Sequence, residues 1–99
     1  MDPLDLLRAC TGFDWDEGNQ DKSWRKHRVS KGEAEQVFFR QPLIAADEAH
    51  SGAESRWHAL GTSNQDRHLL VVFTVRGTLI RVVSARDMSS NERALYQSR

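Results

Sequence analysis

The pattern of apolar and polar positions is clearest in the second half of the chain. Residues 67–86 contain two runs rich in Val, Ile, Leu, Phe and Thr, separated by Arg76-Gly77-Thr78. β-Branched side chains pack well on a pleated surface, and glycine allows the positive φ that tight hairpin loops require. The pattern therefore predicts an antiparallel hairpin in the middle of a sheet. Its first run is apolar at successive positions, which predicts burial from both faces.

The second run is interrupted by polar residues at Arg81, Ser84 and Arg86. An arginine in a buried-looking strand must be ion-paired or must face a solvent-open surface. On a regular strand Arg81 and Arg86 would point to opposite faces, because they are an odd number of residues apart. Two interpretations stay open: a β-bulge near Ser84 brings the arginines together, or only one of them belongs to a site.

A thin apolar stripe distinguishes the first of two predicted helices. A short edge strand is expected at residues 12–15, and Asp16 can cap a helix over residues 17–28. Trp24 is its only strongly apolar residue, whereas a surface helix normally has an apolar stripe covering about a third of its circumference. Either the helix is largely exposed to solvent, or its polar face lines a site. That polar face includes Lys22, Arg25, Lys26 and His27.

The second predicted helix has ordinary signals. Ser30 and Glu33 form a capping box, in which each side chain satisfies a backbone N–H of the first turn. Apolar residues then recur at the spacing of one buried helix face. Pro42 is expected to end the helix, because the residue before a proline is disfavoured in helical geometry.

The remaining elements complete an α+β pattern. Strands are predicted at residues 43–46 and 54–62, and a capping box at residues 89–92 begins a C-terminal helix with Ala94 and Leu95 on its inner side. The order is strand, two helices, four strands, helix. Strands arriving in series predict an antiparallel or mixed sheet with the helices on one face, which leaves the other face free for a ligand.

Length and composition place the chain among small globular proteins. Its 99 residues suit one domain, with residues 12–97 as the core and residues 1–10 as a weakly helical extension that either packs on the domain or forms a loose tail. No apolar run is long enough to cross a membrane, and the acidic N-terminus does not resemble a signal peptide. Cys10 has no cysteine partner, which predicts a reducing, cytoplasmic location.

The charge of the chain is balanced overall but unevenly distributed. Fourteen bases and fourteen acids give a net charge of zero, which argues against strong non-specific binding to polyanions. Residues 1–20 carry −4, residues 21–40 carry +3, residues 41–65 carry −2 and residues 66–99 carry +3. A basic cleft is expected if the two positive segments meet in space.

Several kinds of site lack a motif in this sequence. The four histidines do not have the short paired spacings of metal ligands, and the glycines are scattered rather than gathered into a phosphate loop. No metal and no cofactor are therefore expected.

A set of cations remains as candidate chemistry, and it suits phosphodiester cleavage. Attack by the 2′-hydroxyl of RNA needs a base for that hydroxyl, cations for the charge on phosphorus and an acid for the leaving oxygen. Histidine or lysine could transfer protons, and the arginine fork matches phosphate oxygens. The candidates are Lys26, His27, Arg56, Arg81 and Arg86. Surface ion pairing is the alternative for each arginine, because acids are numerous.

Motifs along most of the chain resemble the BrnT family of toxins from bacterial type II toxin–antitoxin systems. They include Phe13-Asp14-Trp15-Asp16, Lys26-His27-Arg28-Val29-Ser30, Leu70-Val71-Val72-Phe73-Thr74 and Ile80-Arg81-Val82-Val83-Ser84-Ala85-Arg86. The resemblance implies a RelE-like α+β fold with a curved antiparallel sheet. It also implies an endoribonuclease that halts translation and is neutralised by a BrnA-type ribbon-helix-helix antitoxin, which connects it to DNA only indirectly.

The resemblance also implies which residues form the site. By motif match, Lys26, His27, Arg56, Arg81 and Arg86 are expected to be catalytic. Arg81 with Arg86 or Arg56 would grip phosphate, and Lys26 or His27 would transfer protons. Ser84 is also carried over by motif match. It is expected to bind substrate together with Lys22, Arg25 and Arg76, which are not carried over from the family.

Three positions depart from the family pattern. The family usually has glycine at the position of Arg28, asparagine at that of Ser23 and often an aromatic residue at that of Lys31. The turn after the first helix is therefore expected to be built differently. None of the departures removes a cation, so cleavage is still expected. The alternative hypothesis is a non-catalytic interaction module, a decayed toxin that binds an antitoxin or a DNA-bound partner.

Overall fold

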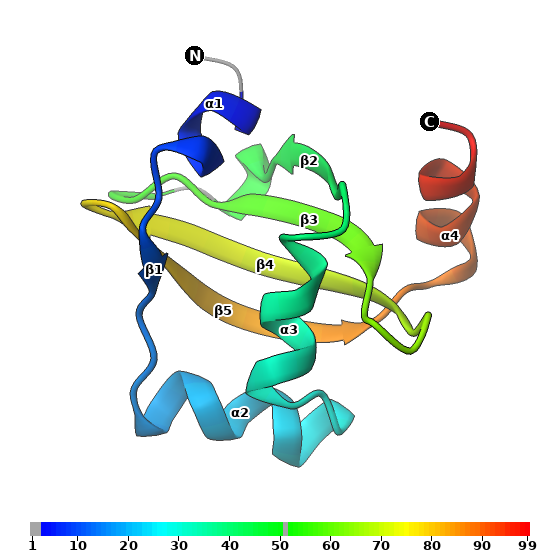
Figure 1. Ribbon diagram of the computed structural model, residues 1–99, viewed down its shortest axis with the longest axis horizontal. Coiled ribbons are helices and arrows are strands. Elements are labelled where there is room, and N and C mark those ends of the chain that lie inside the picture. Colours follow the sequence, from blue (N-terminus) through cyan, green and yellow to red (C-terminus); the bar gives the residue numbers. More distant parts are fainter. Residues whose placement is uncertain (1–2, 51) are drawn as a thin grey trace.

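A five-stranded sheet organises the fold (Figure 1). The computed structural model describes residues 3–50 and 52–99. The strands lie in the order β1-β5-β4-β3-β2 and are β1 (Gly12–Phe13), β2 (Leu43–Ala46), β3 (Trp57–Thr62), β4 (His68–Arg76) and β5 (Leu79–Asp87). The helices are α1 (Pro3–Arg8), α2 (Glu17–His27), α3 (Lys31–Val37), the 3₁₀ helix η1 (Glu48–His50) and α4 (Ser90–Gln97).

The strand directions fit the mixed sheet that the strand order allowed and correct the antiparallel sheet that the family resemblance implied. Neighbouring strands from β2 to β5 are antiparallel, but β1 runs parallel to β5, with Gly12 opposite Leu79 and Phe13 opposite Ile80. The sheet is therefore mixed rather than antiparallel. Tight hairpins force antiparallel pairing, whereas β1 reaches its partner through a long connection that leaves its direction unconstrained. From β1 to α4 the elements follow the predicted order. Two helices are additional: α1, which precedes β1, and η1, between β2 and β3.

The β4–β5 hairpin contains the bulge that the arginine spacing suggested. Its loop has Gly77 at φ 62°, as the turn chemistry predicted. Val72 pairs with Ser84 but Phe73 pairs with Val82, so Val83 is the extra residue of the bulge. The register places Arg81, Ser84 and Arg86 opposite alternate residues of β4. All three therefore share one face of the sheet.

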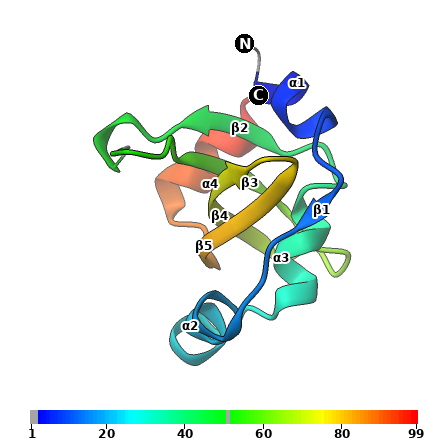
Figure 2. The same cartoon turned by 90° about the vertical axis from the view of Figure 1, so that its left-hand side faces the viewer.

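The opposite face carries the main core. Val71, Phe73, Val82 and Ala85 are buried there, together with residues of α3 and the segment before it. Figure 2 shows α3 on this side of the sheet and α4 on the other. Residues of the N-terminal extension also pack on this core, among them Leu7 of α1. The first of the two interpretations of residues 1–10 therefore holds for the described part of that segment.

The C-terminal helix corrects the expectation that all helices cover one face. Tyr96 of α4 is buried against Leu60 and Leu70, which point away from the main core. Ala94 and Leu95, expected on the inner side, are exposed. The helix covers only one end of this face, so the region of β4 and β5 beside Arg81 stays accessible.

The first long helix is attached to the sheet by polar contacts. Trp24 is 47% exposed, whereas Asn19 and Ser23 are buried. Asn19 Nδ2 donates to the carbonyl oxygens of Asp14 and Val82, at 3.1 and 3.0 Å. The amide of Ala85 donates to Ser23 Oγ at 2.8 Å. A thin apolar stripe is sufficient here because buried hydrogen bonds replace apolar packing.

The helix ends show which boundary signals were reliable. Asp16 caps α2, and capping boxes begin α3 at Ser30 and α4 at Ser89, all as predicted. By contrast, α3 ends at Val37, before Pro42. Arg28, at the position where the family has glycine, adopts the left-handed conformation with φ 55°. The turn is therefore built in the conformation that glycine favours, which corrects the expectation of a different geometry.

Candidate functional site

Two adjoining cavities form a groove on the accessible face of the sheet, and we term it the cationic groove. The cavities measure about 450 and 290 Å³ and share Lys22, Arg56 and Val83 in their linings. Five lysine or arginine side chains and three acids line the groove, so positive charge predominates. The charged and titratable residues are Lys22, Arg56, Arg76, Arg81, Arg86, Asp16, Asp47, Glu54, His50 and His58. Ser84 also lines it.

Arg81 connects the groove to the start of α2. Its guanidinium lies 2.7 Å from an Asp16 carboxylate oxygen and 3.5 Å from one of Asp14. The backbone N–H of Asn19, and then Arg81, lower the pKa of the Asp16 carboxyl. Arg81 is therefore paired before any ligand binds, as the ion-pair alternative predicted, while its side chain still lines the groove.

Arg86 and Arg76 also have acidic partners. Arg86 makes a bidentate contact with Glu92, with both nitrogen–oxygen distances 2.8 Å, and this contact lowers the pKa of Glu92 and raises that of Arg86. Arg76 donates to both carboxylate oxygens of Glu54, at 2.9 and 3.0 Å. Because these pairs join separate elements, the arginines hold the walls of the groove in place.

Lys22 differs from the three paired arginines of the groove. It makes no ion pair with any residue that the structure describes, and it lines both cavities from α2. Arg56, just before β3, also lines both. These two residues lie where the cavities join. A phosphate at this junction could contact both side chains.

A histidine pair held by a buried carboxylate lies at one end of the groove. Asp47 is only 7% exposed, and its two oxygens lie 3.1 Å from His58 Nε2 and 3.1 Å from His50 Nδ1. Burial by itself would raise the pKa of the Asp47 carboxyl. Hydrogen bonds with His50 and His58, and the charge of these histidines, lower it by more, so the pKa of Asp47 lies below its usual value. The ionised carboxylate orients the His58 ring, which lines the groove beside Arg56, Ser84 and Arg86.

Sequence reasoning did not select Asp47 or His58. Strand alternation does place Arg56 and His58 on one face, and this signal could have identified the histidine. Asp47 follows β2 in a polar loop, where no periodicity links it to a residue eleven positions later. Contact between the two depends on the pairing of β2 with β3, in which Ala46 lies opposite Trp57.

Three predicted residues lie outside the groove. Lys26 and Arg25 line a separate shallow cavity on α2, to which Lys22 also contributes. His27 is exposed at the C-terminal end of α2, where its backbone carbonyl accepts a hydrogen bond from Arg67. The structure thus brings together Lys22, Arg56, Arg76, Arg81, Ser84 and Arg86, but not Arg25, Lys26 and His27.

Residues 3–50 and 52–99 contain no group of three or more His, Cys, Asp or Glu side chains arranged to hold a metal ion. Nor does any of their helices have the length and apolar character needed to cross a membrane.

The geometry defines a small α+β protein with a cationic groove suited to a phosphate-bearing ligand. A family model described as the ribonuclease toxin BrnT of type II toxin–antitoxin systems matches residues 15–92. The chain therefore belongs to the BrnT toxin family, as its motifs indicated. No curated protein matched the sequence.

A solved structure agrees with the fold. The crystal structure of the Brucella abortus ribonuclease toxin BrnT is similar to this chain, with a TM-score of 0.58 and 22% sequence identity. The similarity covers 81% of this chain and 99% of the Brucella chain. At this level of identity the likeness supports the mixed α+β fold and not the details of the site.

Proposed function

We propose that this protein is an endoribonuclease toxin that cleaves single-stranded RNA in the cationic groove, without a metal, and thereby halts translation. The observation that carries the proposal is the junction of Lys22 and Arg56 beside His58, on the accessible face of the sheet. Family membership supports the same reaction class, since the family model is that of a ribonuclease toxin. We also propose that the fold is RelE-like, as the family resemblance implied.

The proposed reaction divides the groove residues by role. Lys22 and Arg56 contact the scissile phosphate, and Arg81, Arg86, Arg76 and Ser84 complete the binding surface around it. The RNA 2′-hydroxyl attacks phosphorus and forms a 2′,3′-cyclic phosphate, while the bond to the 5′-oxygen breaks. Because His58 Nε2 is turned toward Asp47, we assign acceptance of the 2′-hydroxyl proton to Nδ1, and water supplies the proton that the leaving 5′-oxygen takes up. Arg25, Lys26 and His27 would contact RNA that extends beyond the groove along α2.

The test compares histidines. Purified protein is incubated with single-stranded RNA and a chelator, and the products are analysed for 2′,3′-cyclic phosphate ends. Replacing a proton-transferring side chain typically lowers the rate by about 10²- to 10⁴-fold. His58→Gln is expected to lose activity to this extent, and His27→Gln to keep it on an RNA too short to extend beyond the groove. The reverse result would restore the sequence-based assignment, which stays a prediction for Lys26 and His27.

A second candidate function is favoured by one observation. Arg76, Arg81 and Arg86 are all paired with acids, as expected if the groove arginines serve structure alone. A decayed toxin of this kind would bind its antitoxin without cleaving RNA. Failure of the folded wild-type protein to cleave RNA, both alone and with ribosomes added, would favour this function.

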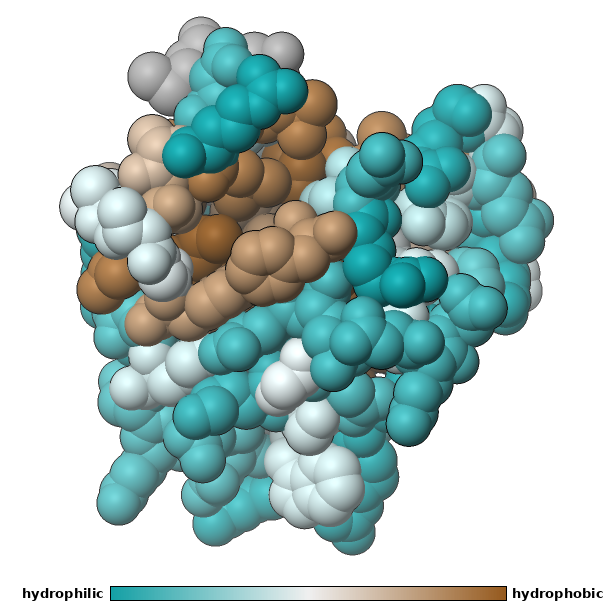
Figure 3. Space-filling view, in the orientation of Figure 1, coloured by the Kyte–Doolittle hydropathy of each residue, from teal (hydrophilic) through white to brown (hydrophobic). Residues whose placement is uncertain are grey.

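We further propose a BrnA-type ribbon-helix-helix antitoxin as the protein partner, with DNA contacted only through it. Figure 3 shows a band of hydrophobic residues on the face that α3 covers, between α1 and α2. Phe39 is 79% exposed, and with Leu7, Phe13 and Phe38 it lines a cavity of about 200 Å³. Exposed apolar surface of this kind is typical of protein-interaction sites. It supports a protein partner in general, on a different face from the groove.

A further inference from the structure

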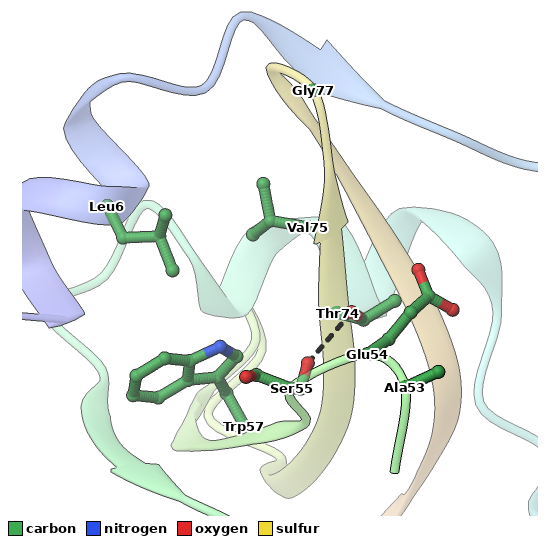
Figure 4. Close-up of a pocket in the computed structure, with 8 residues that line it drawn as sticks. All are labelled: Leu6, Ala53, Glu54, Ser55, Trp57, Thr74, Val75 and Gly77. Atoms are coloured by element: carbon green, nitrogen blue, oxygen red, sulfur yellow. Dashed lines mark hydrogen bonds between the residues drawn. The ribbon is translucent and has the colours of Figure 1, made fainter. Parts of the chain in front are cut away.

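A cavity beside the hairpin tip is not used by the proposed cleavage reaction. It measures about 450 Å³ and lies where the segment leading into β3 passes β4. Figure 4 shows Leu6 of α1, Val75 of β4 and Trp57 of β3 around one side of it, with Glu54 and Ala53 across β4. The cavity therefore has an apolar side with one aromatic ring and a polar side.

The two sides match the two requirements of a nucleobase. A base has a flat apolar face, which stacks on aromatic side chains, and a polar edge, which needs hydrogen-bonding partners. Trp57 offers the indole ring. Ser55 lies beside Trp57, and across β4 the polar side offers the Glu54 carboxylate, which is acceptor-only when ionised; contact with Arg76 lowers the pKa of Glu54.

The cavity adjoins the cationic groove through two shared residues. Glu54 and Thr74 line both spaces, so a ligand can contact them from either one. Both are held in place, since Arg76 contacts Glu54 with two nitrogens and Thr74 Oγ1 donates to the Ser55 carbonyl at 2.8 Å. An RNA strand with a phosphate beside Arg76 could therefore place a neighbouring base in the cavity.

We propose that this cavity is a nucleobase-binding site that gives the nuclease its sequence preference, an inference that rests on the proposed function. The base stacks on Trp57 and presents an exocyclic amino group to Glu54. Adenine, cytosine and guanine carry such a group, whereas uracil does not, so uracil is disfavoured at this position. Leu6, which completes the apolar side, lies outside the part of the chain that the family model matches.

The test measures binding separately from cleavage. Short 2′-O-methylated oligonucleotides, which cannot be cleaved by attack of the 2′-oxygen, are titrated with the wild-type protein and with Trp57→Leu. Trp24→Leu serves as the control, because Trp24 lies on the exposed side of α2. Loss of one stacked base weakens binding by about 5- to 150-fold. We expect this loss for Trp57→Leu with adenine-containing oligonucleotides, and a smaller loss with oligouridylate.

Several outcomes would overturn the base site. Equal binding of all four homopolymers by the wild type, or equal affinity of Trp57→Leu and Trp24→Leu for them, would do so while leaving RNA cleavage intact. Binding that depends on Trp57 without any cleavage of unmodified RNA would support the base site and refute the nuclease. A wild-type protein that neither binds nor cleaves RNA would refute both.

A second variant covers the case in which Trp57→Leu does not fold, since Trp57 also packs against the main core. Leu6→Ala removes part of the apolar wall from α1, where Leu6 is only half-buried. It is expected to weaken binding of adenine-containing oligonucleotides and not of oligouridylate. Unchanged base preference in this variant would count against the cavity.

Discussion

The two faces of β5 use the same backbone for different purposes. On one face, Ile80, Val82 and Ala85 are buried in the main core. On the other, Arg81 pairs with Asp16 and Arg86 with Glu92, so each arginine holds a different helix start in position. The comparison teaches that charge on the groove face is not by itself evidence of ligand binding. Substituting a side chain outside these pairs, such as Lys22, therefore tests ligand binding without removing an ion pair that holds the structure.

The largest difference between the two faces is expected in the free energy of unfolding, when one side chain on each face is truncated to alanine. Phe73 is fully buried, and Phe73→Ala should lower the free energy of unfolding by about 3–5 kcal/mol, because it leaves a cavity that neighbours fill only partly. Lys22→Ala on the groove face should change it by less than about 0.5 kcal/mol. Urea denaturation of the two variants measures both values. Similar losses in the two variants would contradict the division between a structural and a binding face.

A smaller effect is expected at the point where α2 meets the bulge. Ser23→Ala removes the acceptor of the buried Ala85 amide and should cost about 1–3 kcal/mol. Ser98→Ala, at an exposed position, is the matched control and should stay within about 0.5 kcal/mol. Hydrogen exchange should accelerate most at the Ala85 amide. Unchanged protection there would mean that apolar contacts, rather than this bond, hold α2 on the sheet.

The smallest effect concerns the connection between α2 and α3, which belongs to neither face of β5. Arg28 is left-handed and lies over the Trp24 ring at 5.3 Å. Arg28→Gly and Arg28→Ala both remove that contact, but only alanine keeps the strain of a positive φ. The glycine variant should therefore be more stable than the alanine variant by about 1 kcal/mol. Thermal unfolding of the pair measures the difference, and equal midpoints would argue against the left-handed turn.

Local signals in the sequence predicted the elements well. The capping residues Asp16, Ser30 and Ser89 and the turn at Gly77 act through neighbours a few residues away, and the structure has each as predicted. The odd spacing of Arg81 and Arg86 was informative for the same reason. If both arginines belong to one site, this spacing requires an irregularity between them, and the bulge at Val83 supplies it.

Features that depend on distant contacts were not predictable in this way. The parallel direction of β1 is set by pairing with a strand that lies more than sixty residues later. Tyr96 is buried instead of Leu95 because the inner side of α4 depends on where the chain leaves β5. The contact of Asp47 with His58 depends on the register of β2 and β3. In each case tertiary packing decides between alternatives that local pattern leaves equal.

The pairing of β1 with β5 also bears on the order of folding. The Thr11 amide donates to the Thr78 carbonyl, a contact between residues 67 positions apart. Contacts close in sequence, such as those of the β4–β5 hairpin, form quickly, whereas closing a long loop is slow. The Asp16–Arg81 pair spans 65 positions and depends on the same closure. A newly synthesised chain would therefore acquire its hairpin early and complete the groove wall only late, after β1 has docked.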